Sequence, residues 1–255
     1  MTILDDIVAR TRAHLGSEPP PDRAAAENAA RSRPPFALTA ALRSDRINVI
    51  AEIKSASPSA GSIVENPDVE AIATAYKQGG AAAISIVTEP EFFRGSREWI
   101  ARAAGQLPVL IKDFVIDESQ LIRGVAASAS AILLLASLLD ANQIRDFIRC
   151  LDAYLCDALV EVHDEKELER AMNGGARIIG VNNRNLRDFS VDLGASERLA
   201  QQIPDGILRV AESGIKTRAD IDRLRAAGFD AFLVGESLLR QNDRAAAVRQ
   251  LVFGS

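Results

Sequence analysis

The feature that most restricts the fold of this chain is a short apolar run that recurs eight times after residue 47. Each run is rich in Val, Ile, Leu and Ala and begins 20 to 34 residues after the one before it. This spacing leaves room for one helix between successive runs, and such connections make the strands parallel. The eight predicted strands are Val49–Ile53, Ala83–Val87, Val109–Ile111, Ala131–Leu135, Ala158–Val162, Ile178–Val181, Leu208–Ala211 and Ala231–Val234.

Helical segments are predicted between these strands, and glycine follows three of them, as is common where a helix ends in a left-handed residue. Most strand runs are apolar on both faces, which is typical of parallel strands covered by helices. Eight such units favour an α/β fold, a single (β/α)8 (TIM) barrel, over a doubly wound sheet. No Gly-x-Gly-x-x-Gly motif of a dinucleotide-binding sheet follows Ile53. The predicted helices include Asp68–Gln78, Glu118–Ala127, Asp140–Leu155, Glu165–Asn173 and Thr217–Ala227.

The N-terminal part of the chain follows a different pattern. Residues 4–15 have the apolar spacing of a short helix, and three prolines at 19–21 then interrupt the chain. Asp22 is placed to cap a second helix that runs through Arg31. We therefore predict that residues 1–47 form a helical extension capping the barrel and that residues 48–255 form the barrel, as one structural domain.

Composition narrows the range of functions. The chain has 255 residues, with 30 Lys and Arg against 35 Asp and Glu, so its formal charge is −5. An overall basic field that would hold a nucleic acid or an anionic membrane is absent, although a local basic site can still bind a small anion. The longest apolar run, Ala131–Ala136, is far shorter than the roughly 18 residues of a membrane span. With two Cys and two His residues, we expect a reduced, cytoplasmic protein without a metal.

Polar residues gather where the predicted strands end. In barrel enzymes the C-terminal ends of the strands surround the active site, so side chains there carry the functional information. Solvated charges at the starts of loops would explain one or two of these residues but not the whole set. The residues are Glu52, Lys54, Lys112, Glu161, His163, Asn182, Arg184, Glu212 and Ser213. Among them we interpret His163 as a plain strand-end contact.

Glycine and serine residues follow the last two strands, in Ser213–Gly214 and, on either side of Glu236, at Gly235 and Ser237. Glycine lets backbone N–H groups approach an anion closely, and phosphate-binding barrels hold their phosphate at these two strand ends. We therefore predict a phosphorylated small-molecule substrate, with Lys54 as a counter-charge.

Two loops that follow predicted strands, and so lie near the expected active site, have alternative interpretations. The small residues of Ser55–Gly61 are compatible with a mobile flap over the site or with a tolerant connection. Phe92 and Phe93 either cap the core or pack on an apolar ligand, and Phe114 supports the second interpretation.

These residues, taken in order, resemble the indole-3-glycerol-phosphate synthase family. The similarity extends from about residue 48 to residue 240, and the N-terminal extension is similar as well. Its most specific part is the combination of Glu-x-Lys, Lys-Asp-Phe and Asn-x-Arg at the ends of the first, third and sixth strands. The matching runs are Ala51–Lys54 with Ser57–Ser59, Thr88–Glu89 with Phe93–Ser96, Lys112–Phe114, Glu161–His163, Gly180–Arg184, Ala211–Ile215 and Val234–Ser237.

The resemblance implies an activity and a role for each matching residue. The family closes the ring of 1-(2-carboxyphenylamino)-1-deoxyribulose 5-phosphate, decarboxylates it and dehydrates it to indole-3-glycerol phosphate in tryptophan biosynthesis, without a cofactor. Lys112 is then the general acid or an electrostatic support, and an acid role needs burial or a neighbouring cation to lower its pKa. The other catalytic matches are Glu161 and Glu52 for proton transfer, Lys54 and Asn182. The substrate-binding matches are Ser57, Pro58, Phe93, Phe114, Leu133, Leu135, Arg184, Leu186 and Glu212, and the phosphate-binding matches are Lys54, Ser213, Gly214, Gly235 and Glu236.

Two other functions fit part of the pattern. Another phosphosugar-binding lyase or an aldolase of this fold would use Lys112 as a Schiff-base nucleophile. A non-catalytic barrel that binds a phosphorylated metabolite would use Gly214 and Gly235 but leaves Glu52, Lys112 and Glu161 without a role. The sequence leaves open whether the chain is a monomer or a weak homodimer, and whether it contacts other enzymes of tryptophan biosynthesis.

Overall fold

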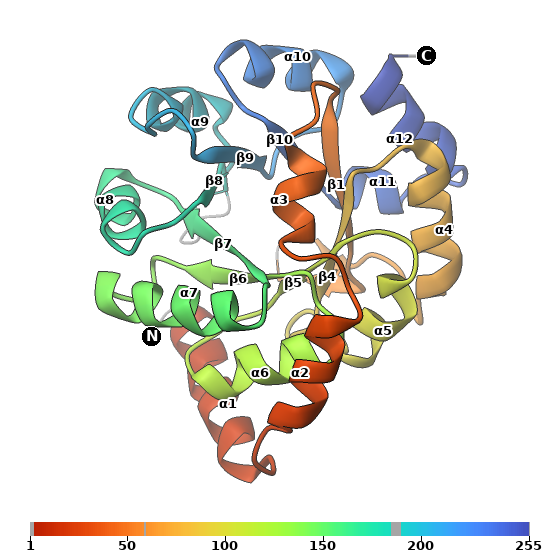
Figure 1. Ribbon diagram of the computed structural model, residues 1–255. Coiled ribbons are helices and arrows are strands. Elements are labelled where there is room, and N and C mark those ends of the chain that lie inside the picture. Colours follow the sequence, from red (N-terminus) through yellow and green to blue (C-terminus); the bar gives the residue numbers. More distant parts are fainter. Residues whose placement is uncertain (1–2, 59, 185–189, 255) are drawn as a thin grey trace.

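The computed structural model describes residues 3–58, 60–184 and 190–254. Its centre is a closed barrel of eight parallel strands with helices on the outside, so the predicted (β/α)8 barrel is confirmed (Figure 1). All eight predicted strands are present, and three of them extend by one residue to include Lys112, Asn182 and Glu212. The barrel strands are β1 (Asn48–Ile53), β4 (Ala83–Val87), β5 (Val109–Lys112), β6 (Ala131–Leu135), β7 (Asp157–Val162), β8 (Ile178–Asn182), β9 (Leu208–Glu212) and β10 (Ala231–Val234). A short antiparallel pair, β2 (Ala56–Ser57) and β3 (Gly61–Ser62), follows β1.

The predicted helices are also present, and the glycines that follow three of them, Gly80, Gly175 and Gly228, have positive φ angles of +94°, +82° and +95°. The barrel helices are α4 (Val69–Gly79), α5 (Glu98–Ala104), α6 (Glu118–Ala126), α7 (Ala141–Ala153), α8 (Glu165–Asn173), α9 (Leu193–Ala200), α10 (Arg218–Ala226), α11 (Glu236–Leu239) and α12 (Arg244–Phe253). Among the described residues, no helix combines the length and the apolar character needed to cross a bilayer.

The N-terminal extension forms three helices, α1 (Ile3–Ser17), α2 (Arg23–Arg31) and α3 (Ala37–Leu42). The carboxylate of Asp22 accepts a hydrogen bond from the backbone of Ala25, so the predicted cap of α2 is confirmed. The sequence does not indicate α3, which is short and follows Phe36, a residue whose side chain makes no capping hydrogen bond.

The three helices of the extension contact different parts of the barrel. Residues of α1 line the cavity at the C-terminal ends of the strands. α2 packs against α6 on the outside. α3 lies across the opposite opening, where Leu38 and Leu42 join the apolar cluster inside the barrel (Figure 1). Thr39 of α3 donates its hydroxyl hydrogen bond to the buried carboxyl group of Asp157, at 2.6 Å.

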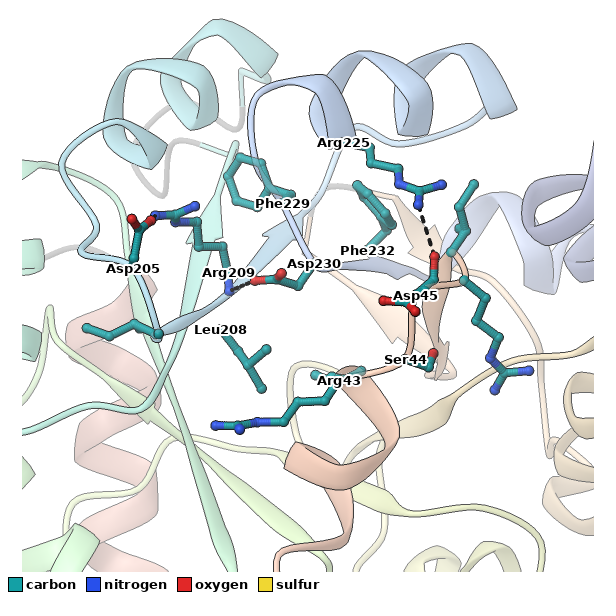
Figure 2. Close-up of a pocket in the computed structure, with 15 residues that line it drawn as sticks. Arg43, Ser44, Asp45, Asp205, Leu208, Arg209, Arg225, Phe229, Asp230 and Phe232 are labelled. Carbon is teal, nitrogen blue, oxygen red and sulfur yellow. Dashed lines mark hydrogen bonds and ion pairs between the residues drawn. The ribbon is translucent and has the colours of Figure 1, made fainter.

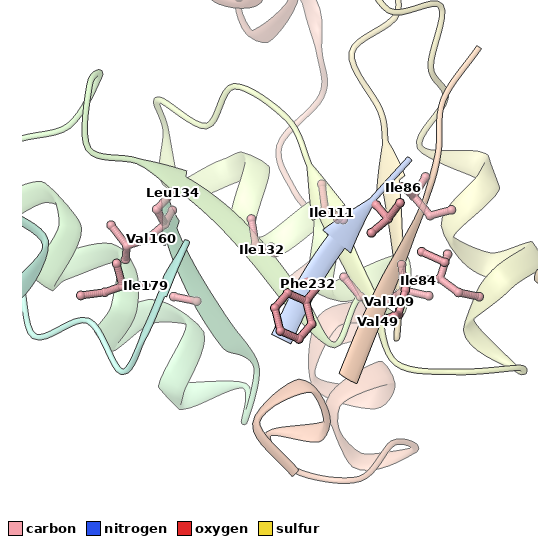
Figure 3. Packing of buried hydrophobic residues seen from close by; sticks show 14 of the residues in the cluster. Val49, Ile84, Ile86, Val109, Ile111, Ile132, Leu134, Val160, Ile179 and Phe232 are labelled. Atoms are coloured by element: carbon pink, nitrogen blue, oxygen red, sulfur yellow. The ribbon is translucent and has the colours of Figure 1, made fainter. Parts of the chain in front are cut away.

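Alternate residues of each strand belong to two apolar layers. Residues such as Ile132, Leu134 and Val160 lie between the strands and the outer helices (Figure 3). The alternate residues, whose side chains point to the other side of each strand, fill the inside of the barrel. Two residues further along each strand, the next inward-pointing side chain lies at the mouth, the opening of the barrel at the C-terminal ends of the strands. The functional side chains continue this inner row, so that Glu52 follows Ile50, Lys112 follows Leu110, Glu161 follows Leu159 and Glu212 follows Val210.

Candidate active site

A cavity of about 800 Å³ opens at the C-terminal ends of the strands. It is lined by every predicted site residue that the structure describes, whereas Leu186 lies outside the described residues. The predicted residues that line it are Glu52, Lys54, Ser57, Pro58, Phe93, Lys112, Phe114, Leu133, Leu135, Glu161, Asn182, Arg184, Glu212, Ser213, Gly214, Gly235 and Glu236.

Lys112 lies at the centre of a charged cluster that it forms with Glu161 and Glu212. Its Nζ donates to Oε2 of Glu161 at 2.8 Å and to Oε2 of Glu212 at 2.6 Å. Both carboxylates are buried, and the lysine side chain is 17% exposed. One ammonium group therefore donates hydrogen bonds to two carboxyl groups. Because a single positive charge cannot balance two negative charges, the pKa values of the two carboxyl groups differ.

The pKa of Lys112 is raised rather than lowered. Burial alone would lower the pKa of Lys112, but the carboxylates of Glu161, Glu212 and Glu52 together outweigh burial. The lowered pKa that an efficient acid role for Lys112 requires is not present in the free site. Lys112 is instead an ammonium group that is held charged by its neighbours and can donate hydrogen bonds.

The pKa values of Glu161 and Glu212 are shifted in opposite directions. Burial would raise the pKa of Glu161, but Lys112, His163 and the amide of Asn182 lower it. Burial and the nearby charge of Glu161 raise the pKa of Glu212 to about 8 despite the contact with Lys112. The cluster thus contains one carboxylate that remains ionised and one that readily holds a proton.

The second oxygen of Glu212, Oε1, is buried and has no hydrogen-bond partner among the described residues. It occupies space that exists only because the residue on the next strand is Gly180. A Cβ atom at position 180 would lie 2.1 Å from this oxygen and 2.7 Å from Cδ2 of Leu159.

Glu52 and Lys54 form a second ion pair beside the first. Nζ of Lys54 donates to Oε1 of Glu52 at 2.6 Å, as the two-residue spacing on one side of the strand predicts. Gly235 at the end of β10 makes room for this pair, because a Cβ atom there would lie 2.6 Å from the same carboxylate oxygen.

Two consecutive asparagines organise the end of β8. Asn182 donates its side-chain amide to Oε1 of Glu161 at 3.0 Å, and its own oxygen accepts the backbone N–H of Arg184. Asn183 is buried and donates to the backbone carbonyls of Glu212 and Ser213 at 3.0 and 3.1 Å. Asn183 therefore fixes the turn that follows β9, a function that the sequence did not indicate.

An aromatic pair forms one wall of the cavity. The rings of Phe93 and Phe114 lie 5.9 Å apart between centroids and are tilted by 40°. The loop that carries Phe93 is held by the buried carboxylate of Glu89, which accepts backbone hydrogen bonds from Glu91, Phe92 and Phe93. Phe93 lines the cavity rather than only covering the core.

The glycine turns lie along another part of the cavity. Ser213 and Gly214 have positive φ angles of +64° and +78°, which turn the backbone sharply after β9. Gly235 directly precedes the short helix α11. Two cations that the sequence did not single out, Lys216 and Arg240, line the same cavity.

Further lining residues come from α1. Ile3, Leu4 and Ile7 lie on the apolar side of that helix and close part of the cavity. The apolar spacing predicted that α1 buries one face, but not which part of the barrel it covers. The loop after β1 also contributes, because the β2–β3 pair is joined to the Phe93 loop by a hydrogen bond from Ala56 N to Phe93 O at 3.1 Å.

A second cavity, of about 580 Å³, lies at the opposite end of the barrel, between the segment after α3 and the starts of β9 and β10 (Figure 2). It is also rich in charge. Arg225 donates to the backbone oxygen of Asp45 at 2.9 Å, and the carboxylate of Asp230 accepts the backbone N–H of Arg209 at 2.7 Å. Arg209 itself donates to the carbonyls of Ile203 and Gly228. These charges hold backbone segments together at the end of the barrel that usually serves stability.

The fold and the charged cluster at the mouth define the class of protein: a (β/α)8-barrel enzyme with acid–base groups at the C-terminal ends of its strands. Comparison with known proteins refines this class. The family model described as indole-3-glycerol phosphate synthase matches residues 4–251. The chain belongs to the indole-3-glycerol phosphate synthase family.

Individual relatives agree with this assignment. The chain is 42% identical to the indole-3-glycerol phosphate synthase of Sulfurimonas denitrificans over 261 residues, which cover 99% of both proteins. It is 48% identical to that of Chlorobium chlorochromatii over 194 residues, covering 75% of this chain and 76% of the relative. A thiamine phosphate pyrophosphorylase structure from Pyrococcus furiosus has a TM-score of 0.60 at 18% identity, covering 80% of this chain and 93% of that one, and shares the fold alone.

Proposed function

We propose that this chain converts 1-(2-carboxyphenylamino)-1-deoxyribulose 5-phosphate to indole-3-glycerol phosphate, with release of CO2 and water, in tryptophan biosynthesis. The observation that carries the proposal is the position of Lys112, an ammonium group between two buried carboxylates in a cavity with aromatic and glycine-rich walls. Membership of the family supports the same reaction.

The shape of the substrate matches the two walls. We assign its aromatic ring to the apolar wall of Phe93, Phe114, Leu133 and Leu135, together with Pro58. We assign its phosphate to the backbone of Ser213, Gly214, Gly235 and Glu236, where positive φ angles and a helix start favour close approach of an anion. Lys54 lines the cavity and supplies a counter-charge, and Ser57, Arg184 and Leu186 complete the substrate-binding set.

The central part of the substrate then lies beside the charged cluster. In the first step a ring carbon attacks the ketone carbon, and the electron pair moves onto the ketone oxygen. Lys112 donates a hydrogen bond to this oxygen, and the alkoxide that forms is basic enough to take a proton from the ammonium group despite its raised pKa. Loss of CO2 restores the aromatic ring. Dehydration removes a proton from the methylene carbon beside the nitrogen and releases the new hydroxyl group as water. Glu161 serves as the base, Glu52 takes part in the proton transfer, and Lys54, or Lys112 once it has been reprotonated, is the acid, while Asn182 orients Glu161.

The aldolase alternative requires a different protonation state. A Schiff base forms only from a neutral amine, whereas the carboxylates around Lys112 raise its pKa and keep it charged. Reduction with borohydride in the presence of substrate separates the two mechanisms. A mass increase at Lys112 would support the aldolase, and an unmodified lysine supports the acid role.

Incubation with the carboxyphenylamino deoxyribulose phosphate tests the proposed reaction directly. Formation of the indole ring produces a fluorescence increase that can be followed continuously. No increase from a sample that circular dichroism shows to be folded would overturn the proposal.

Three further assignments accompany this function. We place the protein in the cytoplasm, because a multiply charged phosphorylated substrate does not cross a membrane freely. We infer that residues 1–47 and 48–255 form one structural domain, which the contacts of α1, α2 and α3 with different parts of the barrel support. We expect a monomer or a weak homodimer, which sedimentation velocity can measure, and pathway enzymes remain candidate partners.

A further inference from the structure

His163 follows β7 and lies between two carboxylates. Its Nδ1 is 3.0 Å from Oε2 of Glu167, which also accepts the backbone N–H of His163 at 2.9 Å. Its Nε2 is 3.4 Å from Oε1 of Glu161 and is buried without a hydrogen-bond partner among the described residues. The imidazole thus connects α8 to the carboxylate that the proposed mechanism uses as a base.

The outer partner of the imidazole is rigidly placed. Glu167 lies in the first turn of α8, where its backbone N–H donates to the capping carboxylate of Asp164 at 2.9 Å. Its other oxygen, Oε1, is 3.9 Å from Arg170. Because Glu167 is held by a helix rather than by a loop, it can hold the imidazole in one orientation.

The inner partner, Glu161, is surrounded by donors. Oε2 accepts from Lys112, whereas Oε1 accepts from Asn182 at 3.0 Å and faces His163. We propose that His163, held by Glu167, is a positioning residue that keeps Glu161 oriented for proton removal. This inference rests on the proposed function.

The support from His163 depends on its charge. The charged groups around the ring are Glu161 on β7, Glu167 on α8 and Glu212 on β9, while Lys112 of β5 and Arg170 of α8 pair with two of these acids. Burial would lower the pKa of His163, but the three acids raise it above its ordinary value. Below this raised pKa both ring nitrogens carry protons and can donate. As the pH rises through it, Nε2 loses its proton and presents a lone pair to Oε1 of Glu161.

The pKa of His163 can be measured directly, because His14 and His163 are the only histidines of the chain. In the His14→Gln variant, the single imidazole signal in an NMR titration reports the pKa of His163. Single-turnover rates of the wild type and of His163→Gln are then compared from pH 5.5 to 9. Glu167→Gln keeps a hydrogen-bond acceptor beside the ring but removes the charge, and serves as the second variant.

We expect the wild type to be faster than His163→Gln by about tenfold at low pH, because the protonated ring holds Oε1 of Glu161 in the reactive orientation, with little change in KM. This ratio should fall as the pH rises through the pKa measured by NMR. In the Glu167→Gln background, both the NMR pKa and the fall in the ratio should move to lower pH together. A merely structural role would reduce the rate equally at every pH.

The control variant is His14→Gln, which also removes an imidazole beside a carboxylate, with Nε2 of His14 3.1 Å from Glu91. Because this pair is exposed, its rate should stay within roughly twofold of the wild type at every pH. A constant ratio for His163→Gln in an active enzyme would overturn the role of His163 alone. A wild type that forms no indole would overturn the proposed function, and the NMR titration would still show whether Glu167 controls His163.

Discussion

The two ends of the barrel both carry cavities lined by basic and acidic side chains, but they use the charges differently. At the N-terminal end, Arg209 and Arg225 donate to backbone carbonyls, and Asp230 accepts a backbone N–H (Figure 2). The one ion pair among the described residues that line this cavity, Arg209 with the exposed Asp205 at 3.3 Å, lies at the surface. At the C-terminal end, side chains pair with side chains, and one lysine serves two buried carboxylates. Charges that hold the backbone stabilise a fold, whereas two buried carboxyl groups that share one cation have pKa values shifted in opposite directions, as is typical of groups that exchange protons.

Removal of Lys112 should produce the largest effect at the C-terminal end. Lys112→Ala loses the donor to the reacting oxygen and leaves two carboxylates without their shared cation, so we expect kcat to fall by about 10³-fold or more. Substrate binding should persist, because the aromatic and phosphate walls are unchanged. Indole fluorescence measures kcat, and titration calorimetry with the inactive variant measures binding. An unchanged kcat would remove Lys112 from the mechanism.

Gly180→Ala tests whether the carboxylate cluster needs its space. The added Cβ would lie 2.1 Å from Oε1 of Glu212, so the carboxylate has to move. We expect a loss in kcat of about 10- to 100-fold from this displacement and a loss of about 1–3 kcal/mol in the free energy of unfolding from overpacking. The matched control is Gly105→Ala, where a Cβ meets nothing within 4 Å. Equal kinetics for the two variants would contradict the interpretation.

Glu212 should make stability at this end depend on pH. Its pKa is raised to about 8 by burial, whereas in the unfolded chain it is near the ordinary value of 4.5. A raised pKa favours folding fully below the unfolded value, and this contribution is lost as the pH rises from there through the folded value. Relative to Glu212→Gln, the wild type should therefore lose roughly 2 kcal/mol or more between pH 5 and pH 9, since one pKa unit is worth about 1.4 kcal/mol.

Chemical denaturation at several pH values measures this difference. The exposed pair of Glu118 and Arg23 provides a control, because Glu118→Gln should show a difference from the wild type that hardly changes with pH. A constant difference for Glu212→Gln as well would contradict the raised pKa.

Much of the catalytic end could be predicted from the sequence, because strand period and strand direction are local properties. The apolar runs located all eight strands, and the barrel rule then placed Lys112, Glu161 and Glu212 at one mouth. Quantities that depend on three-dimensional neighbours could not be predicted. The sequence does not reveal that two carboxylates share Lys112, so it cannot predict that the pKa of Lys112 is raised.

Other features depend on how distant segments dock. The apolar face of α1 was visible in the sequence, but its place beside the cavity follows from packing against the barrel. The space for Glu212 depends on Gly180, which lies on a neighbouring strand. One missed contact did have a local signal, because His163 and Glu167 are four residues apart where a helix begins.

At the N-terminal end, Thr39→Val should affect stability without affecting catalysis. The substitution keeps the shape of the side chain but removes the hydroxyl donor to the buried carboxyl group of Asp157. We expect a loss of about 1.5 kcal/mol in the free energy of unfolding, the usual value for a hydrogen bond to a charged group. Denaturation and indole kinetics measure the two effects, and a parallel loss of kcat would show that α3 influences the mouth.

Arg225→Ala should have the smallest effect of all. The arginine is exposed, and its hydrogen bond to the backbone oxygen of Asp45 can be replaced by water. We expect the free energy of unfolding to change by no more than about 0.5 kcal/mol, with kcat and KM unchanged. A large loss of kcat would mean that the cavity at the N-terminal end influences the active site. The division of the barrel into a structural end and a catalytic end would then be contradicted. Both cavities contain arginine or lysine, so the presence of a basic side chain does not show its role. Comparison of Arg225→Ala with Lys112→Ala distinguishes a charge that holds the backbone from a charge that acts on a substrate.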